Sequence, residues 1–257
     1  MTKTRRVPCK GGREVSREEL ARVSVPTATE TYFPVQHDAC VNTVQRALME
    51  SGIEIRAMHF VLFRKDARLF ATVDLACTLT TGVHLAVAIM NSLDKSLPLG
   101  FLGGARVLEC DNVAFRSNLS VRHKRTRHGN DRFAEAVSQV AKDLRLFGIY
   151  EAERINHLQK TQIDDRSAES LILRAYERNL ASSWALPGII RAWRKPSFKV
   201  FEPRTAWSLL NAFTFSLATR KKSNAPIHAR LTMGLGEMFD AEFGVEPFAI
   251  CRGDADR

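Results

Sequence analysis

Residues 58–75 read MHFVLFRKDARLFATVDL and carry the clearest structural signal in the chain. Two runs rich in aromatic and β-branched residues, 58–63 and 69–75, flank a short polar segment. Runs of this kind on either side of a polar turn are typical of a β-hairpin. Two further apolar runs follow at 83–90 and 105–110, so we expect a mostly antiparallel sheet of about four strands.

The link between the last two runs contains Gly100, Gly103 and Gly104, three glycines within five residues. Because glycine tolerates positive φ and close backbone approach, this spacing predicts a tight turn. The segment lacks the G-x-x-x-x-G-K-[ST] order of a phosphate-binding loop, so we expect no nucleotide site there.

The apolar period becomes helical after residue 131. One apolar stripe runs through 131–160 and predicts a long amphipathic helix or two abutting helices, with the break expected at Gly148. A helix before the sheet should begin near Asp38 and end at Gly52, because these residues are a typical N-cap and a typical C-terminal signal. Further helices are expected at 165–182, 204–219 and 227–242.

These patterns predict an α+β protein in which helices cover one face of the sheet and the C-terminal half is helical. Within the N-terminal arm, Ser16-Arg-Glu-Glu19 fits the capping box of a short helix. We expect four parts along the chain: a basic flexible arm over 1–30, an α+β core with the sheet over 31–130, a helical region packed on that core over 131–245, and a tail over 246–257.

Positive charge is in excess and is unevenly distributed. The 257 residues contain 38 lysines and arginines against 28 acidic residues, a formal net charge of +10. The apolar centre, 53–115, is neutral, and the surplus lies in 1–22, 116–132, 191–204 and 220–230. Basic clusters around a neutral core predict a polyanionic partner, because each neutralised phosphate releases condensed counter-ions. Solvated loops that only keep the protein soluble are the alternative interpretation.

The segment Arg122-His-Lys-Arg-Thr-Arg-His128 is the strongest binding candidate. Arginine forks match phosphate oxygens, lysine adds a point charge, and the two histidines would strengthen binding below about pH 6.5. Phe115, Phe133 and Trp193 are either stacking platforms for single strands or core residues. The predicted nucleic-acid-binding residues are Lys95, Arg116, Arg122, His123, Lys124, Arg125, Arg127, His128, Arg220, Lys221 and Lys222.

A metal-dependent, nuclease-like enzyme acting on nucleic acid is an alternative. Asp94, Asp111 and His123 would then hold a divalent ion that activates water. Short Asp and Asn side chains at strand ends also serve as backbone caps, so we assign no catalytic residue, metal or cofactor. The five cysteines are scattered without a C-x-x-C pair, which argues against structural zinc.

No run of residues approaches 18 consecutive apolar positions, and no apolar segment follows the basic start of the chain. These features predict neither a transmembrane helix nor a signal peptide. We therefore expect a soluble, cytoplasmic protein without a membrane partner.

Five motifs in the sequence resemble those of the domain of unknown function 932 family. They are Tyr32-Phe-Pro-Val-Gln-His37, Asn91-Ser-Leu-Asp-Lys-Ser96, the G-x-R-V-x-x-C-D-N-x-A-F pattern that ends at Phe115, the basic H-K-R-T at 123–126, and Thr205-Ala-Trp-Ser-Leu-Leu-Asn-Ala-Phe-Thr214. The resemblance covers roughly residues 30–240. It implies a phage- or plasmid-associated protein, and the family carries no agreed activity.

The strand pattern is also similar to the β-β-β-α core of the single-strand annealing proteins that phages use in recombination. Together with the charge, this similarity predicts a non-sequence-specific nucleic-acid-binding protein that anneals single-stranded DNA for a phage or plasmid, with RNA as the alternative ligand. Another alternative is a subunit of a phage or plasmid nucleoprotein complex, formed by copies of this chain or with partner proteins.

Overall fold

The sheet is antiparallel throughout, and its strands follow their order in the sequence. The computed structural model describes residues 11–110, 112–218 and 225–248. The strands are β1 (Gly12–Val15), β2 (Ile55–Phe63), β3 (Arg68–Thr80), β4 (Val83–Ser92), β5 (Leu99–Val107) and β6 (Asn112–His123), hydrogen-bonded in the order β1-β2-β3-β4-β5-β6. The predicted antiparallel sheet is therefore confirmed, but it has six strands where about four were expected.

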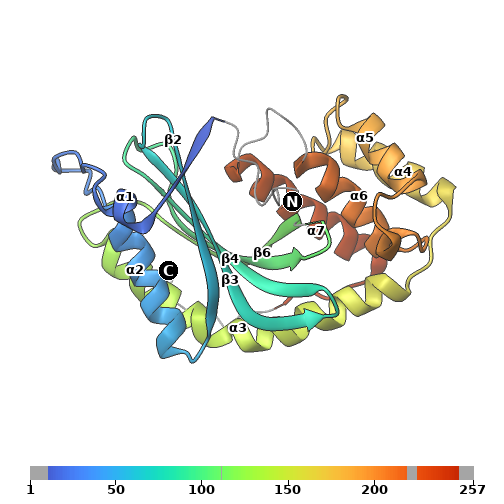
Figure 1. The fold of residues 1–257 in the computed structure, drawn as a ribbon, viewed down its shortest axis with the longest axis horizontal. Helices are drawn as coiled ribbons and strands as arrows, with labels where there is room; N and C mark the ends of the chain where they lie inside the picture. Colours follow the sequence, from blue (N-terminus) through green and yellow to red (C-terminus); the bar gives the residue numbers. More distant parts are fainter. Residues whose placement is uncertain (1–10, 111, 219–224, 249–257) are drawn as a thin grey trace.

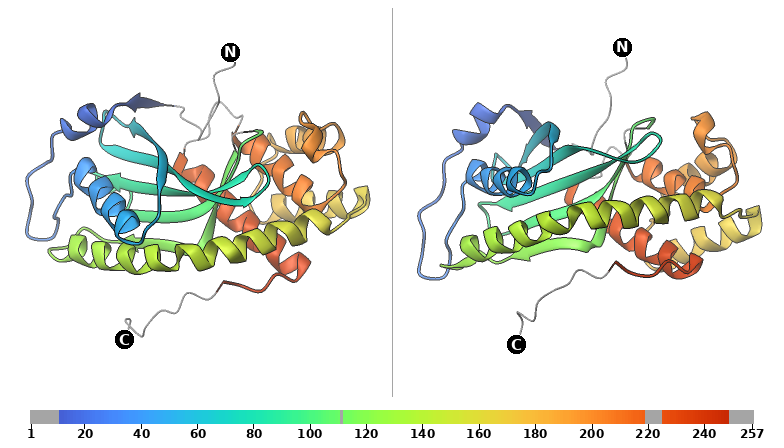
Figure 2. Two further views of the ribbon diagram at one scale, coloured as in Figure 1. Left: turned by 60° about the horizontal axis from the view of Figure 1, so that its bottom comes forward. Right: turned by 90° about the horizontal axis from the view of Figure 1, so that it is seen from below.

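Helices follow the sheet through the C-terminal half of the described chain, as predicted. These are α3 (Gly129–Lys160), α4 (Asp165–Glu177), α5 (Leu186–Arg194), the 3-10 helix η1 (Lys199–Phe201), α6 (Ala206–Ala218) and α7 (Ala225–Phe243). Two further helices, α1 (Arg17–Ala21) and α2 (His37–Glu50), lie between β1 and β2 in the sequence. α2 and α3 lie along one face of the sheet (Figure 1). α3 runs beneath the sheet and continues to the group formed by α4 to α7 (Figure 2).

Both faces of the sheet are covered, at least in part. The larger core joins the sheet to α2 and α3 and extends into the other helices, with Phe101, Phe133 and Phe147 fully buried. A smaller core on the opposite face joins Phe70 and Phe115 to α7. The expectation that helices cover one face is therefore corrected, because the apolar side of α7 packs on the second face.

The glycines of the predicted tight turn lie inside β5 instead. None of the three has a positive φ angle. A Cβ atom on Gly104 would lie 2.1 Å from the carbonyl oxygen of Ala114, and one on Gly103 would lie 1.9 Å from Cδ2 of Leu119. These residues are glycine because β5 and β6 approach closely, and the expected turn was wrong.

Two other sequence-based boundaries also change. Gly148 does not interrupt α3, which continues from Gly129 to Lys160. Within the N-terminal arm, β1 and α1 are packed on the rest of the fold, because β1 pairs with β2 and Leu20 is fully buried. The capping box at Ser16 is confirmed: its side chain accepts from the Glu19 amide, and the Glu19 side chain accepts from the Ser16 amide.

Candidate nucleic-acid interface

Three segments that are far apart in the sequence and that each carry exposed cations meet at one end of the sheet. Phe63 pairs with Arg68 at the β2–β3 turn, Arg68 pairs with Ser92 at the end of β4, and Leu99 pairs with His123 at the end of β6. The turn 64–67 and the loops 93–98 and 124–128 therefore share this end, on the left of the sheet in Figure 1. We call the exposed cations here the basic rim: Arg64, Lys65, Lys95, Arg122, Lys124 and Arg127.

The opposite end of the sheet has a different charge. The β3–β4 turn is Thr81-Gly82, and the connection from β5 to β6 spans residues 108–111, with Glu109 exposed. Neither connection contains a lysine or an arginine. The positive surplus of the sheet is therefore polarised toward the rim.

The rim turns hold charged residues in a costly backbone conformation. The φ angles are 51° at Arg64, 52° at Lys65, 65° at Asp66 and 62° at Lys95. The left-handed region costs a non-glycine residue about 1–2 kcal/mol, and hairpin turns with successive positive φ angles strongly prefer Asn-Gly. Strain of this kind is typical of functional sites. Asparagine or glycine would form the same turn at lower cost, so the charged residues here indicate a role other than stability.

A buried polar network around Asn91 ties the rim segments together. The Asn91 amide nitrogen donates to the carbonyl oxygen of Val35 at 2.7 Å and to Nδ1 of His37 at 3.0 Å. Nε2 of His37 donates to the carbonyl oxygen of Asp66 at 3.0 Å, within the β2–β3 turn. Nε and Nη2 of Arg125 donate to the Asn91 side-chain oxygen at 3.1 and 2.8 Å. The network thus fixes all three rim segments relative to one another.

The loop that carries Lys95 is held by its own short contacts. The Lys95 ammonium lies 4.7 Å from the centre of the Tyr32 ring, and the Tyr32 hydroxyl donates to the carbonyl oxygen of Leu93 at 3.0 Å. Asp94 accepts from Arg68 at 3.0 Å and from the Ser96 amide at 3.1 Å. The polar run that begins at Asn91 therefore shapes the end of β4, which is the capping role considered for it in the sequence.

Two of the predicted phosphate-binding arginines, Arg116 and Arg125, are buried, so neither is an exposed surface cation. Arg116 is enclosed with Glu151 and Asp240, and Arg125 donates to the side-chain oxygen of Asn91. His128 is exposed, whereas the half-buried His123 ring lies edge-on to Phe133 at 6.4 Å. Arg220, Lys221 and Lys222 lie outside the described residues. Phe115, Phe133 and Trp193 are buried, so they are core residues and not stacking platforms.

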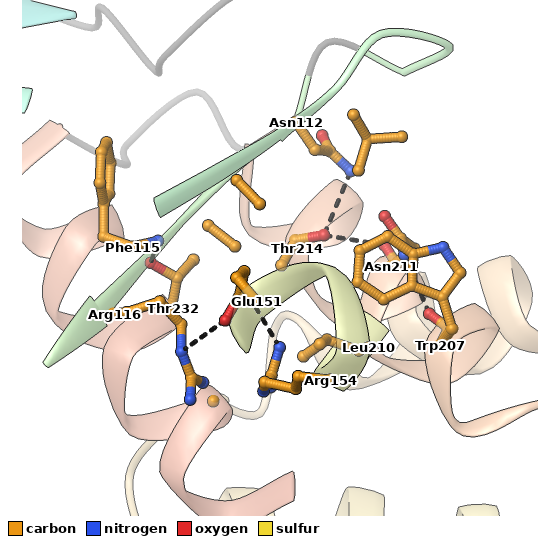
Figure 3. Close-up of a pocket in the computed structure, with 14 residues that line it drawn as sticks. Asn112, Phe115, Arg116, Glu151, Arg154, Trp207, Leu210, Asn211, Thr214 and Thr232 are labelled. Carbon is orange, nitrogen blue, oxygen red and sulfur yellow. Dashed lines mark hydrogen bonds and ion pairs between the residues drawn. The ribbon is translucent and has the colours of Figure 1, made fainter. Parts of the chain in front are cut away.

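A second polar group lies where β6 meets α3, α6 and α7 (Figure 3). Glu151 lies between Arg116 and Arg154, and Asp240 contacts both arginines. The adjoining cavity of about 20 Å³ has room for one water-sized group, so it is too small for a nucleotide. This network is a structural junction.

The structure describes two of the three residues of the alternative metal site, Asp94 and His123. His123 ends β6 and Asn112 begins it, so about 36 Å of strand separates them. Asp111, which precedes Asn112, lies outside the described residues, and Asp94 is at the His123 end. Among the residues that the structure describes, no three His, Cys, Asp or Glu side chains are grouped to hold a metal ion.

Two buried histidines give a prediction for the pH dependence of stability. Burial lowers the pKa of His37 and of His228 below the ordinary value of 6.5. His37 also faces Arg125, which lowers its pKa further, whereas its bond to the backbone of Asp66 acts in the opposite direction. His228 contacts the carbonyl oxygen of Val113 at 2.8 Å. Both rings are therefore neutral in the fold at pH 7.

As the pH falls, the two histidines are protonated in the unfolded chain before they are protonated in the folded protein. Their contribution to the free energy of unfolding is therefore fully present above pH 6.5 and decreases as the pH falls below this value. We expect each histidine to contribute a loss of about 1 kcal/mol between pH 7.5 and 5.5. Urea unfolding at both pH values measures this loss. Equal free energies of unfolding at the two pH values would contradict the neutral, buried state.

Comparison with protein-family models, curated proteins and solved structures finds no match to this chain. The resemblance to the domain of unknown function 932 family therefore stays a prediction. Three of the five stretches that carry this resemblance meet at the rim, where Asn91 is hydrogen-bonded to both His37 and Arg125. The other two meet at the junction, where Asn112 donates to Thr214 at 3.2 Å. None of the described helices has the length and apolarity needed to cross a membrane.

Proposed function

We propose that the basic rim binds the phosphate backbone of single-stranded nucleic acid without sequence selectivity. The observation that carries this proposal is the convergence, on one end of the sheet, of exposed cations from three segments that are distant in sequence. In the fuller form of the proposal, the protein acts in the cytoplasm and anneals single-stranded DNA in phage or plasmid recombination.

The composition of the rim favours backbone contacts over base contacts. Its six exposed cations suit phosphate oxygens, and phosphate contacts carry no direct sequence information. The aromatic residues considered for stacking are buried, so base stacking by them does not contribute. Binding should therefore be governed by counter-ion release and should depend steeply on salt.

Titration of labelled single- and double-stranded DNA and RNA at 50 to 300 mM salt tests the proposal. If all six cations contact a single strand, the logarithm of affinity should fall against the logarithm of salt with a slope of about −4. Complementary oligonucleotides added with the protein should pair faster than alone. Absence of binding at 50 mM salt would overturn the proposal.

Two other observations would favour the alternatives. Cleavage products that need Mg²⁺ would favour the nuclease-like enzyme. Weak binding by the isolated protein, together with a fixed stoichiometry toward a partner, would favour a subunit of a nucleoprotein complex.

The strained hairpin turn gives a prediction in which stability and binding change in opposite directions. The double substitution Arg64→Asn and Lys65→Gly should raise the free energy of unfolding by about 1 kcal/mol, because asparagine and glycine tolerate the positive φ angles of this turn. The same change should weaken binding, because two rim cations are lost. The control is Arg64→Ala with Lys65→Ala, which removes the charges but keeps the strain. A control as stable as the Asn-Gly variant would contradict the strain argument.

A further inference from the structure

Arg125 is a buried cation whose hydrogen-bond partners are all neutral. Its side chain donates to the Asn91 side-chain oxygen through Nε and Nη2, and to the carbonyl oxygen of Leu97 through Nη1 at 2.5 Å. Only 7% of the residue is exposed. Burying a charge without an opposite charge is expensive, so a buried guanidinium normally has a carboxylate partner.

The other buried arginines of the described chain follow that rule. Arg116 and Arg154 are paired with Glu151 and Asp240, so two cations and two carboxylates balance. Nothing comparable surrounds Arg125. Both sites therefore bury a guanidinium group, but only the site of Arg116 and Arg154 supplies carboxylates that neutralise the charge.

The carboxylates near the rim are directed elsewhere. Asp94 acts on Arg125 electrostatically, but its oxygens accept from Arg68 and Ser96. Asp66 forms an ion pair with Arg13 at 3.1 Å, and Asp131 is exposed in the first turn of α3. Burial accordingly lowers the pKa of Arg125, whereas the carboxylates around Arg116 raise its pKa.

We propose that the rim contains a phosphate site next to Arg125, in which a phosphate group of the ligand is the missing counter-ion. Arg125 lies in the loop that carries Lys124 and donates to Leu97 in the loop that carries Lys95. Both lysines are exposed, so they would add positive charge around the same phosphate. Two of the five guanidinium N–H groups have no partner within the described part of the chain. The ligand class is a phosphate monoester or diester.

This inference rests on the proposed function, in that it names the anchoring phosphate of the bound strand. It can be tested separately with inorganic phosphate. At 10 mM phosphate and constant ionic strength, the midpoint of thermal unfolding should be about 3 °C higher than in chloride, as expected for a millimolar dissociation constant. An unchanged midpoint in the wild-type protein would overturn the proposal without any variant.

A matched pair of variants separates this site from general effects of phosphate. Arg125→Gln removes the buried charge and keeps an amide that can donate to Asn91. Arg132→Gln removes one charge from an exposed position seven residues later. We expect the phosphate-dependent shift to disappear in the first variant, with circular dichroism confirming its fold, and to persist in the second. Equal shifts in both variants would assign the effect to general salting-out and overturn the site.

The proposed function and the phosphate site can fail independently. Steep, salt-dependent binding of oligonucleotides without any phosphate-dependent shift would overturn the site and retain the rim. A shift that requires Arg125, in a protein that does not bind oligonucleotides, would retain the site and overturn the nucleic-acid function. In that case the ligand would be a small phosphate compound.

Discussion

Simultaneous replacement of Arg122, Lys124 and Arg127 by alanine should lower the affinity for single-stranded DNA about a hundredfold at 100 mM salt. All three side chains are exposed at the end of β6 and in the loop that follows it. Each phosphate contact with a single strand releases about 0.7 counter-ion, which is worth about 1 kcal/mol at this salt concentration. The salt slope should therefore also become shallower, by about two.

Fluorescence anisotropy across the salt series measures both quantities. The matched control replaces Arg166, Arg178 and Lys195, which are also exposed but belong to the helical region, so the net charge changes by the same amount. Binding by the control should stay close to that of the wild-type protein. A similar loss in both triple variants would mean that total charge, and not the rim, governs binding.

The rim could be predicted from the sequence only in part. The segment 122–128 is basic along its own length, so composition indicated it. Arg64 and Lys65 were missed because the surrounding region, 53–115, is neutral in sum. Their position beside Lys95 and Lys124 depends on strand pairing across β2 to β6, which no local charge count contains.

Arg116 shows the opposite error. A buried arginine and an exposed one look identical in a basic stretch, and the carboxylate that binds Arg116, Asp240, is 124 residues away. The strand that carries it was also missed. Val113 and Phe115 of β6 join the smaller core, whereas Leu119 and Val121 join the larger one, because the β5–β6 register shifts between them. The irregularity breaks the alternation on which strand prediction relies.

The hairpin 58–75 was predicted well for a physical reason. Its apolar residues are contiguous, its turn is local, and both strands lie in the interior of the sheet, so sequence pattern and final environment agree. Long-range features behave differently. Gly103 and Gly104 are required by the neighbouring strand β6, so their spacing could not distinguish a turn from a closely packed strand.

The largest effect on stability is expected at the junction of β6, α3 and α7. Replacing Asp240→Asn leaves Arg116 and Arg154 with Glu151 as their only carboxylate partner among the described residues. Both arginines are almost fully buried, and removal of one partner from a buried ion-pair network typically costs about 3–5 kcal/mol. We therefore expect a decrease of this size in the free energy of unfolding, measured with urea at pH 7.5.

The control for this change lies two residues later in α7. Glu242 pairs with Arg174 at 2.5 Å, but both side chains are about one-third exposed, so Glu242→Gln should cost less than about 1 kcal/mol. Similar losses from both substitutions would contradict the view that burial makes the Asp240 network costly to disrupt. The positive charge of Arg116 is balanced by buried carboxylates, whereas the hydrogen-bond partners of Arg125 are all neutral. Loss of a carboxylate should therefore destabilise the first site, whereas gain of a phosphate should stabilise the second.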